Sequence, residues 1–68
     1  MKNEILMAAR KQSGKTQAQV AKEIEIAKTA YQRYERGKVV PNVIMAMKIA
    51  KSLNTSVEKI WGYQGEQN

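Results

Sequence analysis

Apolar residues recur along the chain at intervals of three and four, the spacing that places side chains on one face of an α-helix. This spacing appears in five stretches, at residues 3–13, 17–24, 27–36, 43–53 and 57–61. Their apolar positions are Ile5, Leu6 and Ala9; Val20, Ala21 and Ile24; Ala30, Tyr31 and Tyr34; Val43, Ala46, Met47, Ala50 and Leu53; and Val57, Ile60 and Trp61. No stretch shows the alternation of a half-buried strand. The pattern therefore predicts an all-α fold, a compact bundle of five short helices.

Residues that end or cap helices separate these stretches. Gly14 is suited to end the first helix, and Thr16 is suited to cap the second. Glu25 and Ile26 interrupt the pattern before the third helix, and we expect Ile26 to dock this turn into the core. The later boundaries are marked by Gly37, Pro41, Asn42 and residues 54–56. We expect one domain at residues 1–62, followed by a flexible tail at residues 63–68.

Charge points toward an acidic partner. The 68 residues include 12 Lys and Arg against 6 Asp and Glu, which gives a formal charge of +6 and an isoelectric point near 9.9. This balance favours a polyanion such as nucleic acid, although the same charge could serve only solubility. No apolar run approaches the roughly 18 residues of a membrane span, so we expect a cytoplasmic protein with no membrane partner.

The residue types on which most enzymes and metal sites depend are missing. The sequence has no histidine to act as a base and no cysteine to act as a nucleophile or zinc ligand. Glu23 and Glu25 lie two residues apart, so they cannot share a helix face as a catalytic pair, and we expect both to be solvated. The sequence predicts no enzyme and no cofactor, and no small-molecule ligand is evident.

The helix predicted at residues 27–36 has a polar, cationic outward face formed by Lys28, Thr29, Gln32 and Arg33. Lys and Arg donate to guanine O6 and N7, Gln pairs with adenine N6 and N7, and the Thr methyl can contact a thymine methyl. Most polar helix faces are only solvated. Here a DNA-binding face is the favoured interpretation over a merely solvated one, because side chains suited to phosphates are predicted at nearby helix starts and loops. These are Thr16, Gln17, Arg36, Lys38 and Asn42.

These residues resemble the helix-turn-helix of the phage repressor and Cro family, also called the XRE-like or lambda-repressor-like domain. The matching positions are Thr16, Gln17, Val20, Ala21, Ile24, Ile26, residues 34–38 (YERGK), Pro41, residues 48–51 (KIAK), Leu53, Ser56, Ile60 and Trp61. The resemblance extends over about residues 4–61 and is specific, because the TQ and YERGK motifs are correctly spaced.

The resemblance implies a compact five-helix lambda-repressor-like domain whose third helix enters the major groove of double-stranded DNA. It implies that Gln17 grips the DNA backbone and that Lys28, Thr29, Gln32 and Arg33 are the base-reading residues. It also implies a buried ion pair between Arg10 and Glu35. This pair would explain why two charged residues stand on or beside apolar positions.

Three residues depart from the family pattern. Glu25 stands where the turn usually has glycine, so we expect a non-glycine residue with positive φ there. Ala27 replaces the Ser or Thr that usually caps the third helix, which removes a capping hydrogen bond. Tyr31 replaces a smaller branched residue, and we expect its hydroxyl to reach the surface, where it could meet a phosphate.

One recognition helix reads only a few base pairs, so such domains usually act as twofold pairs on palindromic half-sites. We expect a homodimer, with interface candidates Ile44, Met45, Ile60, Trp61 and Tyr63. For Trp61, a place in the core of the monomer is the favoured interpretation. The predicted function is a sequence-specific transcriptional regulator, a repressor that occupies an operator. The alternative is a protein-interaction module, an antitoxin or regulatory subunit that binds DNA only weakly and without sequence preference.

Overall fold

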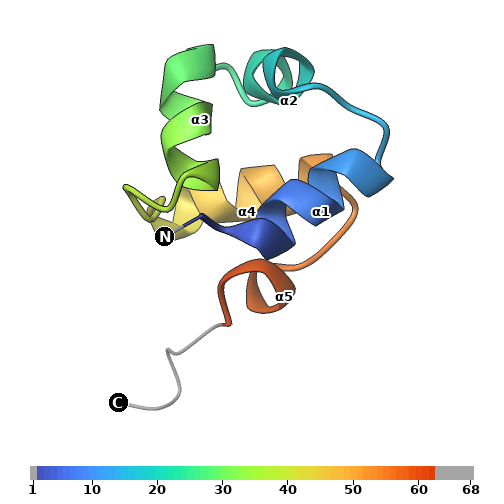
Figure 1. Cartoon of the computed structure of the whole chain (residues 1–68), viewed down its shortest axis with the longest axis vertical. Helices are drawn as coiled ribbons and strands as arrows, with labels where there is room; N and C mark the ends of the chain where they lie inside the picture. Colours follow the sequence, from blue (N-terminus) through green and yellow to red (C-terminus); the bar gives the residue numbers. More distant parts are fainter. Residues whose placement is uncertain (1, 63–68) are drawn as a thin grey trace.

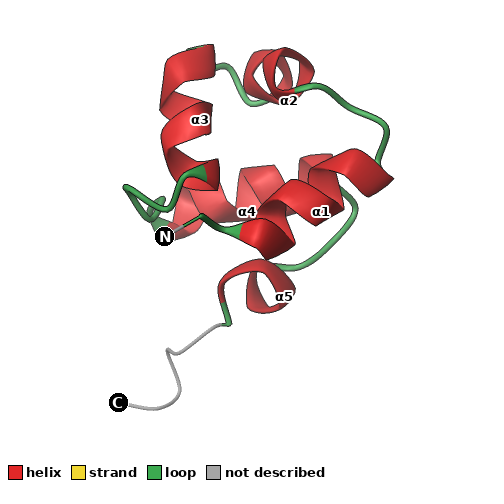
Figure 2. Ribbon diagram, in the orientation of Figure 1, coloured by secondary structure: helices red, strands yellow, loops and turns green. Residues whose placement is uncertain are grey.

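A computed structural model describes residues 2–62, and these residues form five α-helices with no β-strand among them (Figure 1, Figure 2). The helices are α1 (Glu4–Gln12), α2 (Gln17–Glu23), α3 (Lys28–Glu35), α4 (Val43–Ser52) and α5 (Val57–Trp61). Each helix falls within a stretch predicted from the apolar pattern, so the all-α, five-helix prediction is confirmed. The tail predicted at residues 63–68 lies outside the described residues.

The helices surround one small core. α2 packs chiefly against α3, and this pair stands above α1 and α4 in the view of Figure 1. α5 closes the opposite side by packing on α1 and α4. The buried cluster draws side chains from all five helices or their ends, namely Leu6, Val20, Ala21, Ile24, Tyr31, Ile49, Ala50, Leu53 and Ile60. Removal of this apolar surface from water is the main force that holds the helices together.

Side-chain caps begin four of the five helices. Asn3, Thr16, Asn42 and Ser56 each accept a hydrogen bond from the backbone N–H of the third helical residue. At α2 the cap is reciprocal, because the side chain of the third residue, Gln19, accepts from the Thr16 N–H at 2.7 Å. α3 differs, since its cap residue is an alanine and makes no side-chain hydrogen bond, as predicted.

The first four helices end in the same way, with a left-handed residue just past the helix. These residues are Gly14 (φ 74°), Glu25 (φ 62°), Gly37 (φ 74°) and Asn54 (φ 56°). In each case the next N–H bonds the carbonyl oxygen five residues earlier, for example Ile26 to Ala21 at 3.0 Å. The positive φ predicted at Glu25 is confirmed, so a residue with a Cβ holds the conformation that glycine adopts most easily.

The core-facing side of α4 differs from the one that the apolar repeat predicted. Val43 and Met47, both members of that repeat, are 62% and 59% exposed, whereas Ile49 is fully buried. Met45, expected on the outer surface, packs against the core. The prediction failed because residues 43–47 are all apolar, so the pattern alone fits more than one face. Ile5 is likewise exposed, beside the buried stripe of α1.

The longest helix among the described residues, α4, has 10 residues, and no helix in this part of the chain is long and apolar enough to cross a membrane.

Candidate nucleic-acid interface

The outward face of α3 carries the residues predicted to read DNA bases. Lys28, Thr29 and Arg33 are exposed, and Gln32 is half-buried. The charged side chains that α3 exposes are cations, because its acidic residue, Glu35, is only 2% exposed. A narrow helix with cationic and hydrogen-bonding groups on its free side has the chemistry needed to contact base edges in the major groove.

The start of α2 lies beside this face. Gln17, the first residue of α2, accepts a hydrogen bond through Oε1 from Gln32 Nε2 at 3.1 Å. Its own Nε2 donates to Glu35 Oε1 at 2.9 Å. The first turn of α2 is therefore held against the row of base-reading candidates. Groups at such a helix start are suited to phosphate contacts that fix how a reading helix lies on the duplex.

A buried ion pair ties α3 to α1 beneath this face. Arg10 Nε donates to Glu35 Oε2 at 2.6 Å, and Arg10 Nη2 donates to Oε1 at 3.3 Å, so the guanidinium engages both oxygens. Arg10 Nη1 also donates to the Lys15 carbonyl oxygen at 3.0 Å. Burial alone would raise the pKa of Glu35, but hydrogen bonds from Arg10 and Gln17 outweigh it and hold this pKa below its ordinary value. The structure thus contains the pair that the family resemblance implied.

Tyr31 lies in the core, which corrects the expectation that its hydroxyl reaches the surface and a phosphate. The side chain is fully buried, and its hydroxyl has no hydrogen-bond partner among the described residues. Tyr31 and Glu35 are four residues apart and so share the inner side of α3. Burial and the neighbouring Glu35 carboxylate raise the pKa of Tyr31. The ring fills the space between helices and is unavailable to DNA.

The five residues predicted to hold phosphates occupy different local settings. The side-chain oxygens of Thr16 and Asn42 cap α2 and α4, so each residue is held in place at a helix start. Gln17 is half-buried and bonded inward. Arg36 and Lys38 are exposed, at and just after the C-terminal end of α3. The structure therefore puts two exposed cations at the C-terminal end of α3 and the start of α2 beside it.

The predicted dimer residues are scattered between core and surface. Ile44 is 66% exposed. Met45 and Trp61 are half-buried and pack against the core, as favoured for Trp61. Ile60 is only 3% exposed, so its assignment to a surface is corrected: the inner side of the short α5 packs it against the core. Tyr63 lies outside the described residues.

The structure exposes an apolar stripe of which only Ile44 was predicted from the sequence. It consists of Val40, Val43, Ile44 and Met47, which are 73%, 62%, 66% and 59% exposed. The helical spacing of Val43, Ile44 and Met47 places them along one side of α4, and Val40 is exposed in the segment just before this helix. The signal in the sequence was the excess of apolar residues in α4 over what one face can bury. Large contiguous apolar patches are typical of interaction surfaces, which makes this stripe a candidate contact.

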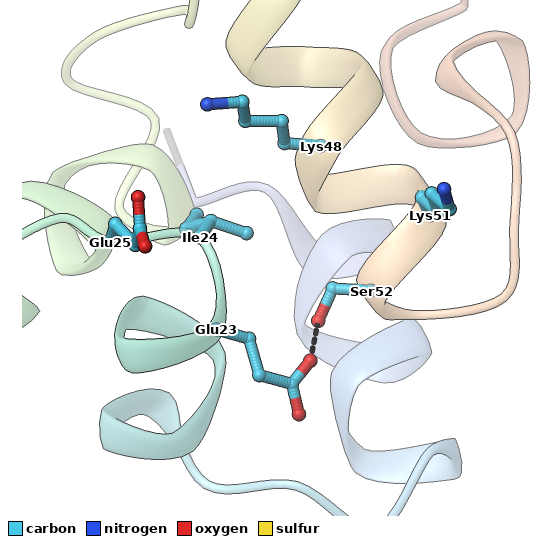
Figure 3. Close-up of a pocket in the computed structure, with 6 residues that line it drawn as sticks. All are labelled: Glu23, Ile24, Glu25, Lys48, Lys51 and Ser52. Atoms are coloured by element: carbon cyan, nitrogen blue, oxygen red, sulfur yellow. Dashed lines mark hydrogen bonds between the residues drawn. The ribbon is translucent and has the colours of Figure 1, made fainter.

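A second polar link, also missed, joins α2 to α4 (Figure 3). Ser52 Oγ donates to Glu23 Oε1 at 2.5 Å, and Lys15 Nζ donates to the same oxygen at 2.9 Å. These hydrogen bonds lower the pKa of Glu23, and the bond from Ser52 has the larger effect. Glu23 is exposed, as expected, but the hydrogen bonds by which its carboxylate bridges two helices were not predicted.

The hollow drawn in Figure 3 lies beside this link. It has a volume of about 270 Å³ and is lined by Glu23, Ile24, Glu25, Lys48, Lys51 and Ser52. Pockets that hold small molecules are mostly apolar and enclose roughly 300 to 1,000 Å³. The hollow is smaller, and four of its six lining residues are charged, so its lining does not mark it as a ligand site.

The short turn between α2 and α3, together with the cationic outward face of α3, defines a helix-turn-helix domain. A helix-turn-helix family model matches residues 6–60, and the chain belongs to this family, of the phage repressor and Cro type. The family is one of DNA-binding transcriptional regulators and not a class of enzymes.

Over 59 residues the chain is 42% identical to the cryptic phage CTXphi transcriptional repressor RstR of Vibrio cholerae serotype O1. The match covers 87% of this chain and 53% of RstR, so the chain spans about half the length of this curated relative.

Proposed function

We propose that this chain is a sequence-specific DNA-binding transcriptional repressor that occupies an operator and blocks access to a promoter. The observation that carries the proposal is the outward face of α3, where cationic and hydrogen-bonding side chains project from a helix anchored by a buried ion pair. Membership of the helix-turn-helix family and the similarity to RstR, a transcriptional repressor, support it. Occupation of a DNA site requires no catalytic group.

In this proposal α3 lies in the major groove. Lys28 and Arg33 donate to guanine, Gln32 contacts an exocyclic amine, and Thr29 meets a thymine methyl. A second set of residues holds the phosphates and fixes the position of α3, namely Thr16, Gln17, Arg36, Lys38 and Asn42. Contacts of the first kind give selectivity, and contacts of the second kind give affinity that depends on salt.

The proposal includes a homodimer on a palindromic operator, because one reading helix contacts too few base pairs to specify a site. Two copies would place their α3 helices one turn of DNA apart, about 34 Å. The apolar stripe that includes Ile44 is the proposed contact between the copies. It carries no charge, and a chain with a net charge of +6 can approach its own copy most easily through an uncharged surface.

Selection of bound duplexes from a random pool at near-physiological salt tests the proposal. We expect enrichment of one palindrome whose half-sites are separated by about one helical turn. Binding that falls with salt equally on every sequence, with no enrichment, would contradict the proposal and favour the alternative of a protein-interaction module.

Two substitutions separate the reading role from the phosphate role. Arg33→Ala should weaken binding to the selected site by roughly 1 to 3 kcal/mol and relax the base preference at one position. Lys38→Ala should weaken binding evenly across sequences and reduce the salt dependence. Both residues are exposed cations, so they form a matched pair for titrations on the selected and random duplexes. Equal losses on both duplexes for Arg33→Ala would count against its reading role.

A further inference from the structure

A chain of hydrogen bonds runs from the buried ion pair to the outward face of α3. Glu35 accepts from Arg10 Nε at 2.6 Å and, through its other oxygen, from Gln17 Nε2 at 2.9 Å. Gln17 Oε1 accepts in turn from Gln32 Nε2 at 3.1 Å. Gln32 follows Lys28 by four residues and so stands in the same outward row. A charge in the core is thus connected to a residue proposed to read a base.

The charge on Glu35 fixes the direction of each bond. A carboxylate accepts hydrogen bonds and cannot donate them, so Gln17 must turn its NH₂ group toward Glu35. The Gln17 oxygen then faces Gln32. Because this oxygen can only accept a hydrogen bond, Gln32 turns its own NH₂ group inward to donate to it. Glu35 is ionised at neutral pH, since the hydrogen bonds from Arg10 and Gln17 outweigh burial and lower its pKa.

Gln32 consequently presents one arrangement of donor and acceptor. An unrestrained glutamine can rotate its amide by half a turn and exchange the positions of its oxygen and its NH₂ group. In Gln32 this rotation would set its oxygen against the oxygen of Gln17. One N–H of Gln32 is occupied by Gln17, and its oxygen accepts no hydrogen bond from the described part of the chain. The group left for a ligand is an acceptor with one adjacent donor.

We propose that Glu35, acting through Gln17, is a positioning residue that holds the Gln32 oxygen toward the DNA, so that the base opposite Gln32 is adenine or cytosine. These two bases offer an exocyclic amine donor in the major groove, whereas guanine and thymine offer acceptors at the equivalent place. The inference rests on the proposed function, because it requires α3 to lie in the major groove. It adds a base preference at one position of the operator. This preference would originate in Glu35 and Gln17, which need not touch that base.

The test measures binding to the selected site with all four bases placed in turn at each position. Gln32→Ala identifies the position that Gln32 reads, because the preference there is lost. At this position we expect the unaltered protein to favour adenine or cytosine over guanine and thymine by roughly tenfold or more. Gln17→Met keeps the length of the side chain but removes both hydrogen bonds, which frees the Gln32 amide to rotate. This variant should reduce the preference to about threefold or less.

Two further variants complete the series. Glu35→Gln can turn either end of its amide toward Gln17, so it should lower the same preference. Gln12→Met is the matched control, because Gln12 is exposed at the end of α1, and we expect no change in the preference. The readout is a ratio between duplexes bound by one protein. A partly unfolded variant loses affinity for all four duplexes equally, so its ratio still reports on Gln32.

A second readout uses the free protein. NMR signals of the Gln32 side-chain NH₂ group should shift in Gln17→Met and in Glu35→Gln, and they should not shift in Gln12→Met. An unshifted signal in Gln17→Met would overturn the inference without reference to DNA. A preference for guanine or thymine at the position that Gln32 reads, or an unchanged ratio in Gln17→Met, would also overturn the inference. The proposed function would still stand if Arg33→Ala relaxed the base preference at another position. If the unaltered protein selects no sequence, the proposed function fails and the inference fails with it.

Discussion

α3 and α4 expose opposite chemistry to solvent. The free side of α3 carries Lys28 and Arg33 and exposes no acidic group. The free side of α4 begins with apolar residues, of which Ile44 is 66% exposed. In a domain of this size each helix buries only one side, so the other side is left for a partner or for water. The difference teaches that the two free sides suit partners of different kinds, a polyanion for α3 and an apolar surface for α4.

The two helices also differ in how they are held, because α3 has buried polar bonds in addition to its apolar contacts. α3 is joined to α1 and α2 through the Arg10–Glu35 ion pair and the bond from Gln17. α4 is held mainly by apolar side chains such as Ile49. Burial of a charge is unfavourable unless it is paired, whereas burial of an apolar side chain is favourable by itself. Loss of one polar partner beneath α3 should therefore have the largest effect on stability.

Glu35→Ala is the most damaging single change that we expect. It leaves the Arg10 guanidinium poorly exposed and without its carboxylate, which should lower the free energy of unfolding by roughly 3 to 5 kcal/mol. Urea denaturation measures this quantity. Glu23→Ala is the control, because Glu23 belongs to an exposed ion pair and exposed pairs contribute little. Equal destabilisation by the two substitutions would show that the support beneath α3 is not special.

The same ion pair predicts sensitivity to acid. The pKa of Glu35 is lower in the folded chain than its ordinary value of 4.5, so the unfolded chain binds the proton more tightly. The stabilisation that ionised Glu35 contributes is therefore complete above the pKa that Glu35 has in the unfolded chain. It is lost as the pH falls through the pKa that Glu35 has in the folded chain. The free energy of unfolding, followed from neutral pH downward, should decrease in this acidic window. Glu35→Gln should show a weaker decrease, and an unchanged slope would contradict the assignment.

Ile44→Lys tests the apolar side of α4 by placing on it a positive charge like those that α3 exposes. A lysine at this exposed position should leave the fold intact and weaken self-association by roughly tenfold or more, measured by analytical ultracentrifugation. Ile5→Lys is the matched control, because Ile5 is similarly exposed, at 58%, but lies outside the apolar stripe. Equal weakening by both substitutions, or by neither, would show that the stripe is not the contact between two copies.

Local features of this domain could be predicted from sequence. Thr16, Asn42 and Ser56 cap helices because the hydrogen bond that each makes spans only three residues. The five helices follow from apolar spacing that is also local. Arg10 and Glu35 are 25 residues apart in the chain, and only the family resemblance connected them before the structure did.

Features that depend on which of several apolar sides of a helix is buried, or on how two helices meet, could not be predicted from the sequence. Residues 43–47 are apolar all round, so packing against α2 and α5, not the pattern, decides that Met47 faces solvent. The ring of Tyr31 was predicted to face inward and its hydroxyl to reach the surface, but packing on the inner side of α3 buries the hydroxyl as well. The bond between Gln17 and Gln32 depends on the angle between two helices, which spacing within either helix does not contain.

The smallest predicted effect concerns the turns that follow α2 and α4. Both are closed by a left-handed residue that is not glycine, Glu25 at φ 62° and Asn54 at φ 56°. Glu25→Gly should relieve about 1 to 2 kcal/mol of strain and lose roughly 0.5 to 1 kcal/mol through the greater freedom of the unfolded chain. The net gain in the free energy of unfolding should be about 0.5 to 1 kcal/mol.

Asn54→Gly is the matched substitution for the turn after α4. Asparagine tolerates the left-handed conformation better than glutamate does, so we expect little or no gain there. Thermal and urea unfolding of the two variants side by side would measure the difference. The bond from Ile26 N to the Ala21 carbonyl oxygen at 3.0 Å closes the turn after α2 and does not involve the Glu25 side chain. Glu25→Gly should therefore leave the base preference unchanged, and a changed preference would show that the Glu25 side chain helps to aim α3.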